Sequence, residues 1–81
     1  MDMHHARKAT TEDVLRIMAE LDEPFLWTIE IAEELGYKSR NSVRDKLEEL
    51  HDRGHVDYRF GRSYIWWITD EGWDYLDGDE A

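Results

Sequence analysis

The sequence of 81 residues contains no cysteine, which excludes disulfide bridges and thiolate metal sites. Long hydrophobic runs are also missing. The longest, Tyr64–Ile68, is far too short to span a membrane, and the first residues lack the apolar stretch of a signal peptide. We therefore expect one small, soluble, cytoplasmic domain with no membrane partner.

Positive charge is scarce as well. Twenty acidic residues oppose ten basic ones, which gives a net charge of −10, and only three of the bases are lysines. A carboxylate-rich surface keeps a protein hydrated in concentrated salt. The charge balance, together with the few lysines and the absence of cysteine, favours a salt-adapted host over an ordinary acidic protein.

The ten bases are spread unevenly along the chain. Residues 37–64 carry seven bases and five acids, a net charge of +2, whereas the rest carries three bases and fifteen acids, a net charge of −12. An acidic protein that gathers its bases in about a third of its length is expected to present that part to an anion.

A first helix is predicted to start at Thr10, which forms a capping box with Asp13. Apolar residues then recur at helical spacing, and Pro24 is expected to end the helix. A short extended segment, Phe25-Leu26-Trp27, follows. The predicted buried residues of this helix are Val14, Leu15, Ile17, Met18 and Leu21.

Two more helices are predicted before residue 55. Thr28 is expected to cap the second helix, which ends at Gly36. Either Ser39 or Asn41 is expected to cap the third, which ends at Gly54. The predicted buried residues are Ile31, Ala32 and Leu35 in the second helix and Val43, Leu47 and Leu50 in the third.

The apolar period then changes from helical to alternating. Residues 56–60 and 63–68 predict two strands, joined by a two-residue hairpin turn, Gly61-Arg62, in which the glycine has a positive φ. Thr69 is expected to cap a short last helix. Together with the earlier segments, the order is helix, short strand, helix, turn, helix, hairpin, helix.

The register of the hairpin stays open. A two-residue turn pairs Val56 with Trp67, whereas a three-residue turn pairs Val56 with Ile68 and buries Trp66 instead. A slip of one residue exchanges the two faces of a strand, so the choice decides which tryptophan enters the core.

The second and third helices are joined by a short connection containing a glycine, as in a helix-turn-helix, and the hairpin after them takes the position of a wing. We therefore predict an α+β winged helix-turn-helix domain over residues 10–76, with a three-helix core, a β-hairpin wing and a short C-terminal helix. Residues 1–9 are expected to form a flexible segment, and residues 77–81 an acidic tail.

Three segments resemble winged-helix transcription regulators. Residues 28–37 resemble their second helix, and residues 39–56 resemble their recognition helix and its exit. Residues 68–76 are similar to the wing-to-helix junction of MarR-like and PadR-like proteins. The short length and the ending Tyr75-Leu76-Asp77-Gly78 resemble small haloarchaeal phage-repressor-like proteins most closely. The resemblance implies a sequence-specific regulator of transcription that binds double-stranded DNA, acting as a repressor in an archaeal host.

A recognition helix lays its first residues against base edges in the major groove, where arginine suits guanine and asparagine suits adenine. Arginines on a wing can enter the minor groove or meet phosphate. The alternative for these charges is a solvated face with intrahelical pairs such as Arg44 with Glu48. The predicted DNA-binding residues are Lys38, Ser39, Arg40, Asn41, Ser42 and Arg44 in the helix-turn-helix and Arg59 and Arg62 in the wing.

A homodimer is also expected, because paired half-sites restore the specificity that one recognition helix lacks. Its contacts are predicted on the first and last helices, where Trp73 and Leu76 offer an apolar edge. The runner-up function is a winged-helix protein-interaction module, which the net charge of −10 favours. A decoy that mimics nucleic acid is a third option, and the uneven charge argues against it.

Other chemistry has little support in the sequence. His51 and His55 are four residues apart, but no further ligand stands nearby, so no metal site is predicted. The four tryptophans are expected to be core residues rather than an effector pocket. No nucleophile motif is present, and neither an enzyme nor a cofactor is expected.

Overall fold

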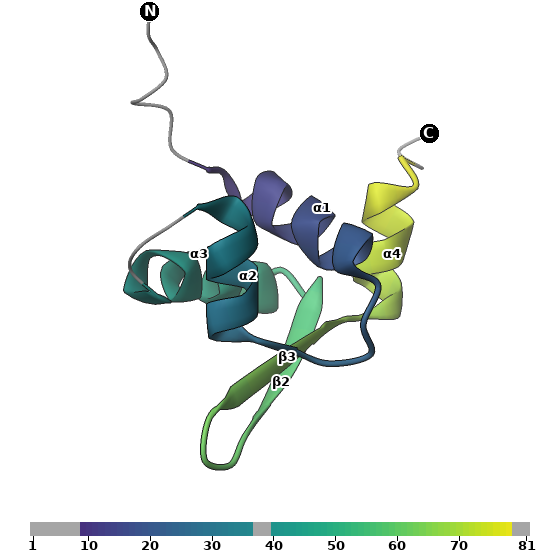
Figure 1. Ribbon diagram of the computed structural model, residues 1–81. Coiled ribbons are helices and arrows are strands. Elements are labelled where there is room, and N and C mark those ends of the chain that lie inside the picture. The colour runs from purple at the N-terminus through teal and green to yellow at the C-terminus, as the bar shows by residue number, and fades with distance from the viewer. Residues whose placement is uncertain (1–8, 37–39, 79–81) are drawn as a thin grey trace, which may run out of the picture.

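The computed structural model describes residues 9–36 and 40–78, except for the side chain of Arg40. Most of the predicted flexible segment, 1–9, and most of the acidic tail, 77–81, therefore lie outside the described residues. The elements are α1 (Thr11–Leu21), β1 (Leu26–Trp27), α2 (Thr28–Leu35), α3 (Arg40–Asp52), β2 (Val56–Phe60), β3 (Tyr64–Ile68) and α4 (Asp70–Leu76) (Figure 1). This order confirms the predicted α+β winged helix-turn-helix fold.

The start of α1 follows the prediction, whereas its end does not. The backbone N–H of Thr10 donates to Asp13 Oδ2 at 3.0 Å, and that of Asp13 donates to Thr10 Oγ1 at 3.1 Å, so the capping box is present. The helix ends at Leu21, before Pro24, because Asp22 adopts the left-handed conformation with a φ of 53°. A short polar side chain tolerates that conformation better than most.

The predicted cap of α2 is wrong. Trp27 occupies the N-cap position, and its backbone N–H donates to Glu30 Oε1 at 2.8 Å. Thr28 is the first residue of the helix, and it is buried. Its hydroxyl accepts a hydrogen bond from Trp66 Nε1 at 2.9 Å, so a partner in the core uses the oxygen that was expected to cap the helix. Gly36 ends α2 with a φ of 79°, as predicted.

Helix α3 begins at Arg40, so Asn41 lies inside the helix and does not cap it. The other predicted cap, Ser39, lies outside the described residues. The helix ends at Asp52, and Gly54 follows with a φ of 84°. The predicted stripe of Val43, Leu47 and Leu50 is buried, with at most 1% of each residue exposed.

The strands form an antiparallel sheet in the order β1-β3-β2, and Val56 pairs with Ile68. The wing connection therefore has three residues, 61–63, and the predicted two-residue turn is wrong. Gly61 is not among the described glycines with positive φ, which are Gly36, Gly54 and Gly78. This register buries Trp66, which is 1% exposed, at a place where its indole N–H has a partner.

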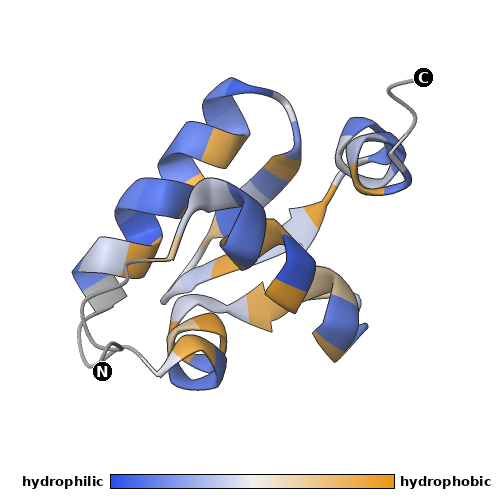
Figure 2. Ribbon diagram, turned by 90° about the horizontal axis from the view of Figure 1, so that it is seen from above, coloured by the Kyte–Doolittle hydropathy of each residue, from blue (hydrophilic) through white to orange (hydrophobic). Residues whose placement is uncertain are grey.

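The core lies between the three large helices and the inner face of the sheet. Figure 2 shows hydrophobic positions on the inner sides of the helices and mostly hydrophilic ones outside. Trp66 is the tryptophan that belongs to this core, whereas Trp27 is 50% exposed and Trp73 is 42% exposed, so the expectation of four core tryptophans is wrong. The buried apolar residues are Val14, Leu15, Met18, Leu26, Ile31, Ala32, Val43, Leu47, Leu50, Val56 and Trp66. Within the described ranges, no helix is long and apolar enough to cross a membrane.

Helix α4 packs directly on the backbone where α3 leads into β2. Thr69 caps the helix as predicted, accepting a hydrogen bond from the backbone N–H of Gly72 at 3.1 Å. Its own backbone N–H donates to the carbonyl of His55 at 3.1 Å. Gly72 is buried so closely that a Cβ built on it would lie 2.1 Å from the same carbonyl oxygen. Only glycine allows this approach.

We predict that Gly72→Ala destabilises the domain. Alanine favours a helix over glycine by about 1 kcal/mol, but the clash with backbone forces α4 away and is expected to cost about 1–3 kcal/mol in net stability. Urea unfolding measures the change. Gly61→Ala is the control, because a Cβ there meets no atom within 4 Å, and a change within about 0.5 kcal/mol is expected. A Gly72→Ala variant as stable as the parent would contradict the packing of α4.

Candidate nucleic-acid interface

The buried stripe of α3 decides which of its side chains face solvent. Asn41 and Ser42 are exposed in its first turn, and Arg44 is partly buried beside them. The hairpin of β2 and β3 runs outward past the helices on the same part of the molecule, as a wing does (Figure 1). The first turns of α3 and the wing therefore form one continuous surface.

Arg44 joins α3 to the wing. Its guanidinium carbon lies 4.4 Å from the centre of the Tyr64 ring, and its Nη2 donates to the Tyr64 hydroxyl at 3.3 Å. Its Nε lies 3.5 Å from Oε2 of Glu48, one helical turn further on. The intrahelical pair with Glu48, the alternative to DNA contact drawn from the sequence, is therefore present, while Arg44 lies away from the buried stripe as predicted. The two contacts hold the guanidinium near the wing instead of leaving it free in solvent.

The inner face of the wing is aromatic. Because side chains alternate along a strand, the paired positions Tyr58 with Trp66 and Phe60 with Tyr64 share one face. Neighbouring rings are in contact, with centroids 5.0 Å apart for Tyr58 and Trp66 and 4.6 Å apart for Phe60 and Tyr64. Arg59, paired with Ile65, lies on the opposite face. The wing therefore turns rings, and not Arg59, toward α3.

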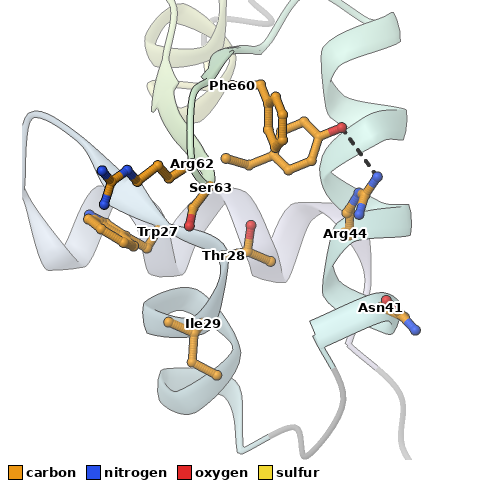
Figure 3. A pocket seen from close by; sticks show the side chains of 9 residues that line it. Trp27, Thr28, Ile29, Asn41, Arg44, Phe60, Arg62 and Ser63 are labelled. Atoms are coloured by element: carbon orange, nitrogen blue, oxygen red, sulfur yellow. Dashed lines mark hydrogen bonds between the residues drawn. The ribbon is translucent and has the colours of Figure 1, made fainter.

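A cavity of about 320 Å³ opens between the start of α2, the first turns of α3 and the wing (Figure 3). Its polar side chains include Asn41, Arg44 and Arg62, and its apolar walls include Trp27, Phe60 and Tyr64. In Figure 3, Trp27 and Arg62 lie on one side, and Asn41 and Arg44 on the other. Residues from the start of α2, from α3 and from the wing therefore line one hollow.

Three predicted site residues come together in this cavity, namely Asn41, Arg44 and Arg62. Ser42 is exposed on α3 but does not line it, and Arg59 faces away. Arg40 belongs to α3, but its side chain is not described, and Lys38 and Ser39 lie outside the described residues.

The sequence interpretation missed the aromatic walls of the site. Trp27 was assigned to the core, although half of it is exposed. Strand alternation places Tyr64 and Trp66 on one face in any register, whereas Phe60 shares that face only in the three-residue register. The hairpin register, which stays open from the sequence, is therefore the information that was needed to find the aromatic walls.

Charge changes sign along α3. Its exposed acids, Asp45, Glu48 and Glu49, follow Asn41 and Arg44 along the chain. Further on, His51 Nε2 lies 3.6 Å from Oδ1 of Asp57. Of these acids, Glu48 pairs with Arg44, so an anion is accommodated best at the first turns of α3 and at the tip of the wing.

His51 and His55, the pair that the sequence offered as possible metal ligands, each pack against an aromatic ring. His51 packs against Tyr58 with ring centroids 5.0 Å apart, and His55 stacks on Tyr75 at 4.7 Å. Among the residues that the structure describes, no group of three or more histidine or carboxylate side chains is arranged to hold a metal ion.

No family model matches the sequence, and no curated protein gives a significant match. The solved structures of similar fold include the following two. The ST1889 protein from the thermoacidophilic archaeon Sulfolobus tokodaii has a TM-score of 0.72 at 22% identity, over 89% of this chain and 71% of that one. A mutant of Lactococcus lactis ZitR has a TM-score of 0.67 at 18% identity, over 96% of this chain. The match spans 54% of the ZitR chain. At these identities the likeness shows the fold, which is that of a winged helix-turn-helix protein.

Proposed function

We propose that this chain is a regulator of transcription that binds double-stranded DNA in a sequence-specific manner. The observation that carries the proposal is that Asn41, Arg44 and Arg62 all line one cavity between α3 and the wing. These are the side-chain types that read adenine, read guanine and pair with phosphate. They belong to residues 37–64, where seven bases oppose five acids in an otherwise acidic chain.

The geometry suits docking of α3 in the major groove. The first turns of a recognition helix contact base edges there, while a wing contacts the flanking backbone or the minor groove. Arg44 is already held by Tyr64 and Glu48, so little further side-chain freedom is lost when it contacts a base. Asn41 precedes it by one turn, and Arg62 is placed for a phosphate or the minor groove.

Arg44→Ala is predicted to weaken binding to the preferred duplex by about 1–3 kcal/mol and to relax the preference at one base pair. Fluorescence anisotropy on a set of singly substituted duplexes measures both effects. Arg16→Ala is the matched control, because Arg16 is exposed on α1, where it pairs with Glu12. The control removes the same charge and is expected to leave the preference unchanged.

Tyr64 variants refine this experiment. Tyr64→Phe keeps the ring under the guanidinium and should keep the base preference, whereas Tyr64→Leu removes the ring and should reproduce part of the Arg44→Ala defect. An equal loss of affinity on every duplex would reduce Arg44 to a phosphate contact. No loss at all would remove Arg44 from the interface.

We further propose that the protein acts as a repressor in a salt-adapted archaeon. The repressor role and the archaeal host rest on the resemblance of residues 10–78 to winged-helix regulators and on the short length and the ending Tyr75-Leu76-Asp77-Gly78, which resemble small haloarchaeal phage-repressor-like proteins. The salt adaptation rests on the net charge of −10 and on the scarcity of lysine. At ~1 M salt the Debye length is about 3 Å, so acids outside the contact surface hardly repel DNA.

The salt proposal predicts that the domain is more stable in ~1 M salt than in ~0.1 M, because screening reduces repulsion among its carboxylates. DNA affinity should also fall less steeply with salt than its number of arginines suggests, because close contacts and shape then carry most of the binding. Thermal melts and binding titrations along a salt series test both points. A melting temperature that stays flat or falls with salt would defeat the adaptation but leave the DNA proposal intact.

We also propose a homodimer through α1 and α4, which lie side by side (Figure 1). The exposed apolar surface there includes Trp73 on α4, which shares a cavity with Trp67. Phe25, beyond the end of α1, is also exposed, and its ring centroid lies 5.7 Å from that of Trp67 in an edge-to-face contact. Leu76 is only partly exposed and packs against the core, so it adds less to this edge than the sequence suggested.

The predicted outcome is a dimeric mass by light scattering in molar salt, which Trp73→Ser should shift toward the monomer by removing exposed apolar surface. The matched control is Phe60→Ser, which removes another exposed ring from the wing and should leave the mass unchanged. A monomeric mass for the unaltered protein at tens of micromolar would count against the dimer.

A protein-interaction module is the second candidate function. The observation in its favour is a second cavity, of about 360 Å³, lined by Trp67 and Trp73 and by the acids Asp22 and Glu23. This surface lies apart from Asn41 and Arg44, so it can serve a partner with or without DNA. Failure to bind any duplex at any salt would favour this second function.

A further inference from the structure

The cavity between α3 and the wing has more exposed aromatic surface than contact with a fully paired duplex requires. Trp27 is 50% exposed and Phe60 is 60% exposed, yet both line the cavity that holds Arg44 and Arg62. A duplex offers base edges and phosphates, which polar side chains meet. Its base faces are stacked inside, out of reach of such rings. Exposed apolar residues that line one hollow mark an interaction or ligand-binding site, and the part of DNA that suits aromatic rings is an accessible base face.

We propose that this cavity binds an unpaired nucleotide of DNA, next to the duplex that α3 contacts. The inference rests on the proposed function, because Asn41 and Arg44 serve both. An unpaired base can stack on Trp27 or Phe60, as bases do in proteins that bind single strands. Its phosphate can pair with the guanidinium of Arg62 or Arg44, because arginine binds phosphate with charge-assisted hydrogen bonds.

The backbone around the cavity is well held. Trp27 pairs with Ile65 of β3, and its N–H is bonded to Glu30. Phe60 pairs with Tyr64 at the end of the hairpin, and the Tyr64 ring already carries the Arg44 guanidinium. Trp27 and Phe60 belong to different strands and, by their pairing, to opposite faces of the sheet, so they line the cavity from either side of β3. The cavity volume of about 320 Å³ lies in the range of pockets that bind small ligands.

Three DNA probes separate this proposal from ordinary duplex binding. They are a short single-stranded oligo(dT), a fully paired duplex, and the same duplex with one unpaired thymine. Trp27→Ala is expected to weaken the first and third by about tenfold or more, since stacking of a single base contributes that much. The paired duplex should change by less than about threefold. Trp27→Phe keeps an aromatic face and should recover most of the loss.

Trp73→Ala is the matched control, because Trp73 is a similarly exposed tryptophan at the other cavity. It should leave the affinity for oligo(dT) and the preference for the unpaired thymine over the paired duplex unchanged, because any loss of the proposed dimer affects the two duplexes alike. Stacking should also quench tryptophan emission on addition of oligo(dT), and Trp27→Phe should abolish that quenching. A thermal melt of each variant at the same salt identifies any loss of binding that follows from unfolding.

Two results would overturn the inference. One is unchanged binding of oligo(dT) by Trp27→Ala. The other is an equal loss on all three probes, which would make Trp27 a contact to the backbone of the duplex. If the paired duplex still responds to Arg44→Ala, the proposed function survives either result. If no probe binds at all, the inference and the proposed function fail together.

Discussion

The buried hydrogen bond from Trp66 Nε1 to Thr28 Oγ1 is the contact on which the rest of the structure depends. It joins the middle strand of the sheet to the first residue of α2, across 38 positions of sequence. A buried indole N–H without a partner would cost about 1–3 kcal/mol, so this bond favours the register in which Trp66 faces inward. That register places Tyr58, Phe60 and Tyr64 on the side of the wing that faces α3. The aromatic walls of the candidate site therefore follow from a contact in the core.

The same bond explains where prediction from the sequence succeeded and where it failed. Local signals predicted the capping box at Thr10 and the helix stops at Gly36 and Gly54, because each depends on residues a few positions apart. The cap assigned to Thr28 failed because a tertiary partner used its hydroxyl. The hairpin register stayed open because two neighbouring tryptophans fit the strand pattern equally well. Only the position of a partner in another element decides between them.

The part of the candidate site that the sequence predicts is the part that follows from helical spacing. The position of Arg44 away from the buried stripe follows from helical spacing, but its attachment to Tyr64 needs the wing to be placed against α3. Trp27 was assigned to the core because large aromatic residues are usually buried in small domains. Its exposure depends on the position of β1 as an edge strand of the sheet, which hydrophobicity alone does not indicate.

The central claim is that the first turns of α3 and the tip of the wing form one DNA-binding surface. Amide chemical-shift mapping by NMR tests it most directly, because each backbone position reports separately and no residue needs to be replaced. Addition of a preferred duplex in molar salt should shift the amides of Asn41–Leu47 and of Phe60–Tyr64, and leave those of α4 near their free positions. Shifts confined to α4 and the Phe25–Trp67 surface, with residues 41–47 unaffected, would contradict the account.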